Sequence, residues 1–259
     1  MLWHPLSTPS EARPPAPMTM RAQTIPARHC FADHTHSWNQ LVYATSGVLS
    51  VVADGRSFVI SPDLGAWVPA GTVHHVGSFL GAEFRSLWIE GGAEGSLGAG
   101  QVTVFRVAPL LRALILEATD IDGQEDDDGY YGRIQRLIMD QLGRASAVSS
   151  ILPWPRTAAL SQLCECLYAD PADPRGPEEW GKELGMSERT LARRFLADTG
   201  MTLRSWRRSL RQFRAIELLE SGLDITSTAM ELGYSSTSAF TYAFRMEMQC
   251  TPQAYMRAK

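Results

Sequence analysis

The histidines of this chain are concentrated near its beginning. Three of the six, His29, His34 and His36, lie within eight positions, and none occurs after His75. On a strand, His34 and His36 would point to the same face, because successive side chains alternate. Two imidazoles placed in that way can share one metal ion or one substrate. The spacing indicates either a metal-dependent active site or a remnant of one in a protein with another function.

A second group of residues suited to chemistry is a run of arginines in the last third of the chain. Residues 186–214 contain eight arginines and only two acidic residues, a local net charge of +6, although the formal net charge of the chain is −4. An acidic front half followed by an arginine cluster indicates one module that contacts a polyanion and one that does not. The alternative is an ordinary solvated face.

Length and composition limit the class of protein. The 259 residues suffice for two domains of roughly 100–200 residues each, and 44% hydrophobic with 20% charged residues is typical of soluble globular proteins. The N-terminal stretch is proline-rich and lacks the apolar run of a signal peptide, and no window reaches 18 apolar residues. We therefore expect a cytoplasmic protein with no membrane partner.

The pattern of elements changes along the chain. Short β-rich runs alternate with turn signals over residues 38–90, including the hairpin signal Asp54-Gly55, which favours a small barrel or sandwich. Two helical stripes follow at 107–143, where they could pack on the barrel or pair with a second subunit, and the chain reads as helix from 156 onward. We expect an α+β protein in four parts: a flexible N-terminal arm at 1–22, a barrel at 23–106, a helical linker with dimerisation helices at 107–150, and an all-α domain at 156–259.

The all-α region contains an internal duplication. The sequence "ELGMS" at 183–187 recurs as "ELGYS" at 231–235, and the match continues, for example from Phe195 to Phe244. Each copy has a short helix, a turn centred on glycine, and a second helix that begins near a serine. This arrangement predicts two helix-turn-helix units.

The second helix of each copy is the candidate DNA reader. In the first copy, Arg189 and Arg193 share an outer face with Ala192 beside them, and arginine can grip guanine through two hydrogen bonds. In the second copy the outer face carries Thr237, Ser238 and Tyr242, whose hydroxyl groups discriminate bases weakly. We expect the first copy to contribute more specificity. We also expect Arg207, Arg208, Arg211 and Arg214, on the helix between the copies, to be available to phosphate or solvent.

Residues from about 156 to 257 resemble the DNA-binding region of the AraC/XylS family of bacterial transcription regulators. The resemblance is carried by the tail "ELLESGLDITSTAMELGYSSTSAFTYAFRMEMQCTPQAYMR". It implies that the base-facing positions of the family fall on Arg189, Ala192, Arg193, Thr237, Ser238 and Tyr242. Tyr242 departs from the family pattern, since many members carry a basic residue there.

The front half resembles a cupin. The first cupin motif is matched by His34-Thr35-His36 followed at cupin spacing by Gln40 and Gly47, and the second by "PAGTVH", which ends at His74. The resemblance implies a barrel that brings His34, His36, Gln40 and His74 to one interior point suited to a divalent transition metal. The departure is Gln40 in place of glutamate, which would hold a metal less tightly than a carboxylate.

These observations predict a ligand-responsive transcription regulator and not an enzyme. Its cupin-like domain would sense a small molecule or a metal and modulate the binding of two helix-turn-helix units to promoter DNA. Expected partners are double-stranded promoter DNA, a small-molecule effector, a second copy of the chain, and RNA polymerase as a further candidate. One alternative is a metal-dependent cupin enzyme, with iron, manganese or nickel, fused to DNA-binding units. Another is a metal-free pocket whose histidines bond one another or the ligand.

Overall fold

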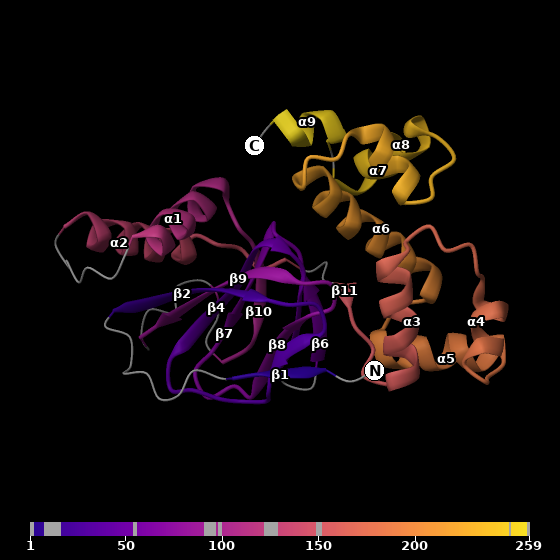
Figure 1. Cartoon of the computed structure of the whole chain (residues 1–259), viewed down its shortest axis with the longest axis horizontal. Coiled ribbons are helices and arrows are strands. Elements are labelled where there is room, and N and C mark those ends of the chain that lie inside the picture. Colours follow the sequence, from indigo (N-terminus) through magenta and orange to yellow (C-terminus); the bar gives the residue numbers. More distant parts are fainter. Residues whose placement is uncertain are drawn as a thin grey trace. The chain divides into compact units, whose positions relative to one another are not determined.

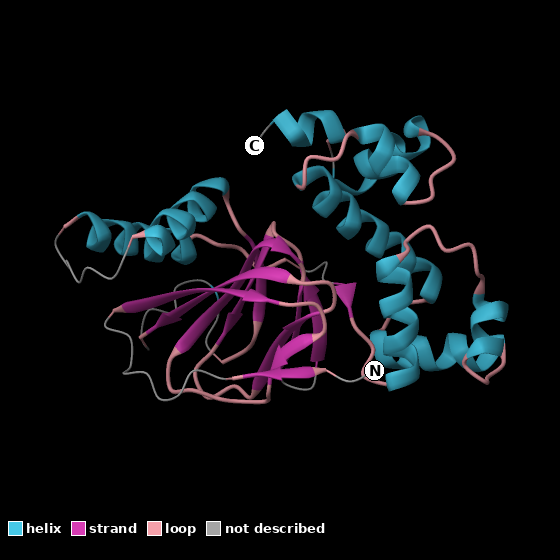
Figure 2. Ribbon diagram, viewed as in Figure 1, coloured by secondary structure: helices cyan, strands magenta, loops and turns pink. Residues whose placement is uncertain are grey.

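The structure is a computed structural model that describes residues 3–7, 17–53, 56–90, 97, 100–121, 129–148, 152–248 and 250–257. The chain divides into two compact units, Leu2–Ile151 and Leu152–Lys259. The first unit is made of strands and two helices, and the second is almost entirely helical, as Figure 2 shows. The predicted α+β class is therefore confirmed.

The N-terminal unit contains two β-sheets and a helical pair (Figure 1). Its strands are β1 (His4–Leu6), β2 (Met18–Ile25), β3 (His29–Phe31), β4 (Asn39–Gly47), β5 (Leu49–Ala53), β6 (Arg56–Ile60), β7 (Leu64–Val68), β8 (His74–Ser78), β9 (Ala82–Ile89) and β10 (Thr103–Arg106). Within this unit one sheet has the order β1-β3-β8-β5-β6 and the other the order β10-β7-β4-β9-β2. The helices are α1 (Pro109–Asp120) and α2 (Tyr130–Gly143).

The second sheet has two different faces, because side chains alternate along each strand. On β4, Leu41 and Tyr43 belong to the buried core that also contains Leu111 of α1 and Ile138 of α2. Gln40, one residue before Leu41, lines a pocket on the opposite face. One face of the sheet is thus covered by the helical pair, while the other faces the first sheet and is free to build a site.

The N-terminal residues differ from the expected flexible arm at 1–22. Strand β2 begins at Met18 and pairs with β9 along its whole length, from Met18 opposite Ile89 to Ile25 opposite Ala82. Strand β1 pairs with β3 in parallel. Because this region is rich in proline, its sequence did not indicate strand β2, which is stabilised by pairing with the distant strand β9. Asp54 and Gly55 of the predicted hairpin lie outside the described residues, but Ala53 and Arg56 on either side of them are paired.

The C-terminal unit begins with the short strand β11 and continues as helices. Its elements are β11 (Leu152–Pro153), α3 (Ala158–Ala169), α4 (Pro177–Glu183), α5 (Glu188–Thr199), α6 (Leu203–Glu220), α7 (Ile225–Glu231), α8 (Thr237–Met248) and α9 (Pro252–Arg257). None of the helices described in either unit is both long enough and apolar enough to span a membrane.

The long helix α6 joins two separate cores of this unit. Near its start, the fully buried Trp206 makes edge contacts with Trp154 and Phe195, and its indole nitrogen donates to the carbonyl oxygen of Pro153 at 2.7 Å. Near its end, Ala215, Ile216 and Leu219 pack with Phe240 and Phe244 in a second cluster. Each helix-turn-helix unit therefore has its own core, and α6 connects these two cores within the C-terminal unit.

Candidate functional site

The two predicted helix-turn-helix copies have the same local geometry. Helix α4 ends in a turn in which Gly185 has φ 67°, and α7 ends in a turn in which Gly233 has φ 71°. The next amide closes each turn: that of Met186 donates to Gly181 at 2.8 Å, and that of Tyr234 donates to Ala229 at 3.0 Å. Glycine is needed because these φ values strain other residues. The sequence repeat thus encodes a repeated turn.

Helix α5 presents the predicted arginines to solvent. The Ser187 hydroxyl caps the helix by accepting from the Thr190 amide at 3.2 Å, while Leu191 and Phe195 are fully buried. Arg189, Ala192 and Arg193 are all exposed on the remaining surface. Among the described residues neither arginine has an ion-pair partner. The same holds for Arg194, which sequence reasoning missed although it belongs to the arginine run.

Helix α8 presents a weaker version of the same surface. The Ser236 hydroxyl accepts from the Ala239 amide at 3.1 Å and begins the helix. Ser238 is exposed, Thr237 is half-buried, and Tyr242 is 68% exposed. A tyrosine this exposed, in a helix whose phenylalanines are buried, is a candidate contact residue.

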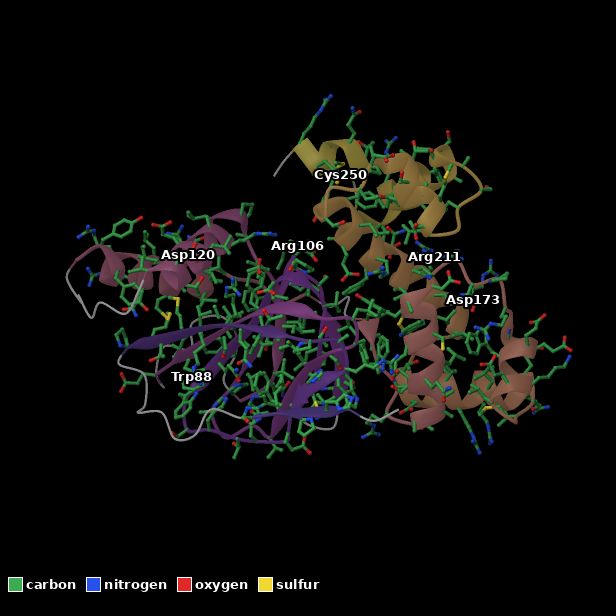
Figure 3. The ribbon with its side chains drawn as sticks, in the orientation of Figure 1. Trp88, Arg106, Asp120, Asp173, Arg211 and Cys250 are labelled. Atoms are coloured by element: carbon green, nitrogen blue, oxygen red, sulfur yellow. The ribbon has the colours of Figure 1, made fainter. Side chains whose placement is uncertain are left out.

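The arginines of α6 differ from expectation, because internal acceptors hold all four. Arg207 donates to the carbonyl oxygens of Asp173 and Arg175, the latter at 2.7 Å, and Arg211 donates to that of Pro171 at 3.1 Å. Arg208 pairs with Glu247 at 2.6 Å, and Arg214 pairs with Glu217 at 2.8 Å. Figure 3 labels Arg211 and Asp173 in this region. Arg207 and Arg211 thus secure α6 to the loop after α3, Arg208 links α6 to α8 while staying exposed, and Arg214 pairs within α6.

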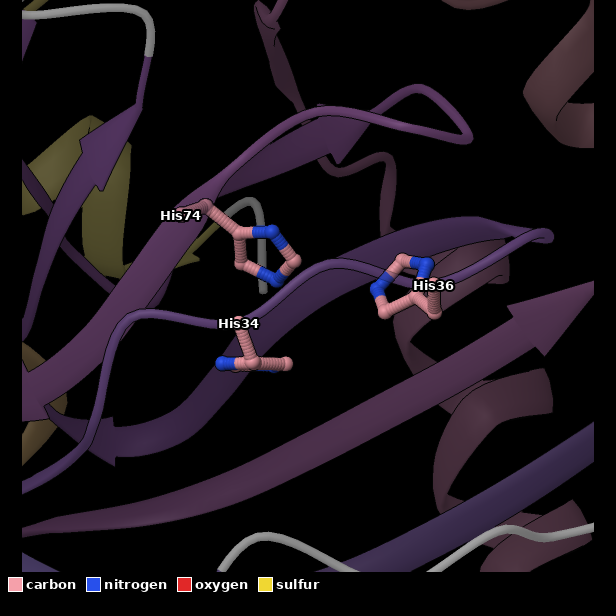
Figure 4. Close-up of side chains that lie close together, drawn as sticks. All are labelled: His34, His36 and His74. Atoms are coloured by element: carbon pink, nitrogen blue, oxygen red, sulfur yellow. The ribbon is translucent and has the colours of Figure 1, made fainter.

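The predicted histidine cluster lies in the N-terminal unit. Each of His34, His36 and His74 offers a ring nitrogen, and these atoms lie within 4.8 Å of one another. Figure 4 shows the three rings, His74 at the start of β8 and the other two on the segment before β4. This segment is not the regular strand expected from the alternation. His34 makes an isolated antiparallel bridge with His74, and that bridge brings the rings together.

Backbone hydrogen bonds fix the orientation of all three rings. The Nδ1 atoms of His34, His36 and His74 lie 2.8, 2.7 and 2.9 Å from the carbonyl oxygens of Ala32, Trp38 and Thr72 respectively. A carbonyl oxygen only accepts, so each Nδ1 carries the proton and each neutral ring keeps its lone pair on Nε2. A backbone carbonyl that holds Nδ1 and leaves Nε2 available is typical of histidines that bind a metal.

Burial keeps His34 and His74 neutral by lowering the pKa of each ring. Loss of hydration lowers the pKa of His74 to about 4, with further lowering by the neighbouring His34 and His36 and opposition from its bond to Thr72. Burial likewise lowers the pKa of His34. His75, the neighbour of His74, pairs instead with Asp33 at 2.9 Å and is not part of the cluster. His34 and His74 therefore offer unprotonated nitrogens near neutral pH, which is the form that metals bind.

Gln40 completes the cluster, as the cupin resemblance implied. Its Oε1 lies 3.0 Å from Nε2 of His36 and 2.8 Å from Nε2 of His74, while its Nε2 donates to the Ser86 hydroxyl at 2.7 Å. When both rings carry their proton on Nδ1 alone, Nε2 of His36, Nε2 of His74 and Oε1 of Gln40 are three acceptor atoms that meet at one point. Two arrangements satisfy these atoms: a cation shared by the lone pairs, or a half-turn of the amide that directs its two N–H groups at the rings. The donor set fits a divalent transition metal.

A pocket of about 360 Å³ opens beside the cluster, between the two sheets. Its walls come from β2, β3, β4, β8, β9 and the segment before β4. The lining residues are Arg21, Gln23, Phe31, His34, Thr35, His36, Ser37, Trp38, Gln40, Val76, Phe84, Ser86 and Trp88. Ligand sites commonly have volumes of about 300–1,000 Å³ and mostly apolar walls with a few polar groups. The pocket has these properties.

Comparison with known proteins assigns both units. Residues 19–190 match the family described as the AraC-like ligand binding domain, and residues 180–258 match a helix-turn-helix domain. The chain belongs to the AraC family. It is a transcription regulator with a ligand-binding domain and a helix-turn-helix DNA-binding domain, as predicted, and DNA and a small-molecule effector are its partners.

Several relatives of this AraC-family chain are regulators by name. It is 27% identical to the HTH-type transcriptional regulator NimR of Escherichia coli K12, over 86% of this chain and 81% of NimR. It is 26% identical to the activator RhaR of Shigella dysenteriae serotype 1, over 87% of this chain and 86% of RhaR. A crystal structure of ToxT from Vibrio cholerae covers 93% of this chain and 98% of ToxT, with 12% identity and a TM-score of 0.40.

Proposed function

We propose that this regulator senses a divalent transition metal, which His34, His36 and His74 bind reversibly through Nε2, with Gln40 as a neutral oxygen ligand. The observation that carries this proposal is the convergence of ring nitrogens from His34, His36 and His74, all within 4.8 Å of one another, with Oε1 of Gln40 at 3.0 Å and 2.8 Å from Nε2 of His36 and His74. Nickel, zinc, iron and manganese are candidate ions, since imidazole and amide oxygen suit these metals. The metal would act as a Lewis acid that holds the cluster together.

Gln40 is the residue that would make the binding reversible. In the empty site its amide can turn and donate to His36 and His74, while its oxygen accepts from Ser86. In the loaded site the oxygen faces the ion, and the amide nitrogen returns to Ser86. A glutamate could serve only the loaded site, because an ionised carboxylate has no N–H to offer the rings. A site that is satisfied in both states suits a sensor, whose ligand must be released.

Occupancy can affect the rest of the unit through β4. Gln40 contributes to the cluster, and its neighbour Leu41 packs on the opposite face of the sheet in the core that contains Leu111 and Ile138. A shift of β4 at Gln40 therefore changes the packing of α1 and α2. An effector must bind one state more tightly than the other to shift the equilibrium between them.

The helical pair is our candidate for a homodimer interface. Leu110 of α1 and Leu137 of α2 are 51% and 44% exposed, and Tyr130 at the start of α2 is 56% exposed. Apolar side chains left on the outside of a helical pair favour association with a second copy. A dimer would double the DNA contacts and set the spacing of the two half-sites. Light scattering after size-exclusion chromatography tests this: a Leu110→Glu/Leu137→Glu variant should be monomeric at concentrations where the parent protein is dimeric.

The metal proposal is tested by DNA binding. A DNA site selected from a random pool is titrated with protein treated with a chelator, before and after one equivalent of nickel or zinc is added. We expect the affinity for the selected site to change on addition of metal, and the change to be absent in a His34→Ala/His74→Ala variant. Equal responses in the parent and the variant would overturn the proposal. We further propose that the chain is not an enzyme, so a bound effector should be recovered chemically unchanged.

A further inference from the structure

The wall of the pocket beyond the histidines contains one cationic side chain that the metal site does not use. Arg21 lies on β2 opposite Ser86 of β9, and both residues line the pocket. The guanidinium carbon of Arg21 lies 4.7 Å from the centre of the Trp88 ring. Stacking on an aromatic face occupies the plane of the guanidinium but leaves the N–H groups along its edge available to an acceptor.

The charge of Arg21 is uncompensated in the part of the chain that the structure describes. Among the described residues Arg21 has no ion-pair partner, and the lining of the pocket contains no aspartate or glutamate. A guanidinium at the wall of a largely apolar pocket creates a positive potential that attracts an anion. Arginine matches a carboxylate through two parallel hydrogen bonds, which fixes orientation as well as charge.

Four aromatic side chains contribute to the remaining walls. Trp38 lies parallel to the His36 ring, with an angle of 5° between the rings and 5.1 Å between their centres, and its centre is 5.0 Å from that of Trp88. Phe84 and Phe31 form a second aromatic pair, with centres 5.9 Å apart. Ring faces of this kind pack well on a planar ligand. The volume of about 360 Å³ lies at the small end of the range for ligand sites.

We propose that this pocket binds a small planar carboxylate, whose carboxylate pairs with Arg21 and whose unsaturated body packs on the aromatic walls formed by Trp38, Trp88 and Phe84. This inference rests on the match of this unit to the AraC-like ligand binding domain. It does not depend on the metal, because the pairing with Arg21 needs no bound ion. The anion and the metal would then be two separate ligands of the N-terminal unit.

The experiment uses full-length protein and isothermal titration calorimetry with trans-cinnamate as the probe. Two compounds isolate the features that the proposal requires: trans-cinnamamide has the same shape without the charge, and 3-cyclohexylpropionate has the charge without the planar body. We expect cinnamate to bind and each control compound to bind at least about 10-fold more weakly, the effect of losing one charged hydrogen-bonding interaction or an aromatic contact. Equal affinities for cinnamate and cinnamamide would overturn the proposal, and so would the absence of cinnamate binding.

Variants show where the anion binds. Arg21→Gln should weaken cinnamate binding by about 10-fold or more while leaving cinnamamide binding unchanged. Arg56→Gln is the matched control, since Arg56 is exposed on β6 and does not line the pocket. Cinnamate binding that survives in Arg21→Gln would contradict the assignment.

Metal and anion binding are separated by repeating the titration after chelator treatment and in the His34→Ala/His74→Ala variant. Cinnamate binding that persists without metal supports the anion site, even if the protein proves to bind no metal. Metal binding with no binding of cinnamate would overturn the anion site and leave the metal proposal standing.

Discussion

The backbones of His34 and His74 are joined by two hydrogen bonds, each 3.0 Å long, in which each amide donates to the other residue's carbonyl oxygen. This bridge ties the segment before β4 to the first residue of β8 and holds the two ring centres 4.3 Å apart. Two parts of the chain that are distant in sequence thereby contribute to one site. The cluster depends on this pairing as much as on the histidines themselves.

Gln40→Glu should tighten metal binding and lower the thermal stability of the metal-free protein. A carboxylate is a stronger ligand than an amide, so the affinity for nickel or zinc should rise by on the order of 10-fold. Without metal, the carboxylate would face the lone pairs of His36 and His74, so the melting temperature in chelator should fall. Competition with a fluorescent chelator and thermal melts measure the two effects. Gln23→Glu places the same charge in the pocket without these contacts; an equal gain there would assign the effect to general electrostatics.

Arg193→Ala should weaken binding to a selected DNA site by roughly 1–3 kcal/mol without changing stability, since its side chain is exposed on α5. The base preference should relax at one position of the site, which a binding assay on single-base variants of the DNA would show. The parent protein should also lose affinity steeply as salt rises, because arginines displace counterions from DNA. Unchanged affinity and unchanged base preference would show that Arg193 does not contact the bases.

Arg207→Met should affect stability and not DNA charge recognition. Its two bonds to carbonyl oxygens of the loop after α3 are lost, at a cost of about 1–3 kcal/mol in the free energy of unfolding. Chemical denaturation measures this. The slope of DNA affinity against salt should stay the same in this variant, whereas Arg194→Ala should reduce the slope by about one unit. A reduced salt dependence of DNA affinity in Arg207→Met would show instead that Arg207 contacts DNA.

The pH dependence of stability should depend in part on Asp173. Hydrogen bonds from Arg175, including one of 2.9 Å from its Nε, hold the pKa of Asp173 below its usual value of 3.8. A depressed carboxyl pKa contributes stability that is present above the unfolded value and is lost as pH falls through the folded value. The free energy of unfolding should therefore fall below about pH 4 more steeply in the parent protein than in Asp173→Asn.

Local patterns in the sequence were enough to predict the helical half of the fold. The glycine turns at Gly185 and Gly233 and the exposed face of α5 follow from residues within one turn of each other, so a single sequence contains the signal. The candidate metal-binding set was identified only because its spacing resembles a known pattern. Its tautomers were not predictable, because they depend on carbonyl oxygens in the turns.

Features that depend on distant partners escaped prediction. The strand β2 within the expected arm is stabilised by pairing with β9, which no local pattern indicates. The α6 arginines looked available because the carbonyl oxygens that hold Arg207 and Arg211 belong to a loop more than thirty positions earlier. The sequence did not single out Arg21, since its stacking on Trp88 depends on the pairing of β2 with β9.

Metal titration of chelator-treated protein by isothermal calorimetry tests the central proposal most directly. We predict that the parent protein binds one equivalent of nickel or zinc per chain. His34→Ala/His74→Ala should bind none, whereas His75→Ala should bind as the parent does, because His75 pairs with Asp33 outside the cluster. Circular dichroism confirms that each variant is folded. Folded parent protein that binds no metal, or a double variant that binds as much as the parent, would contradict the account.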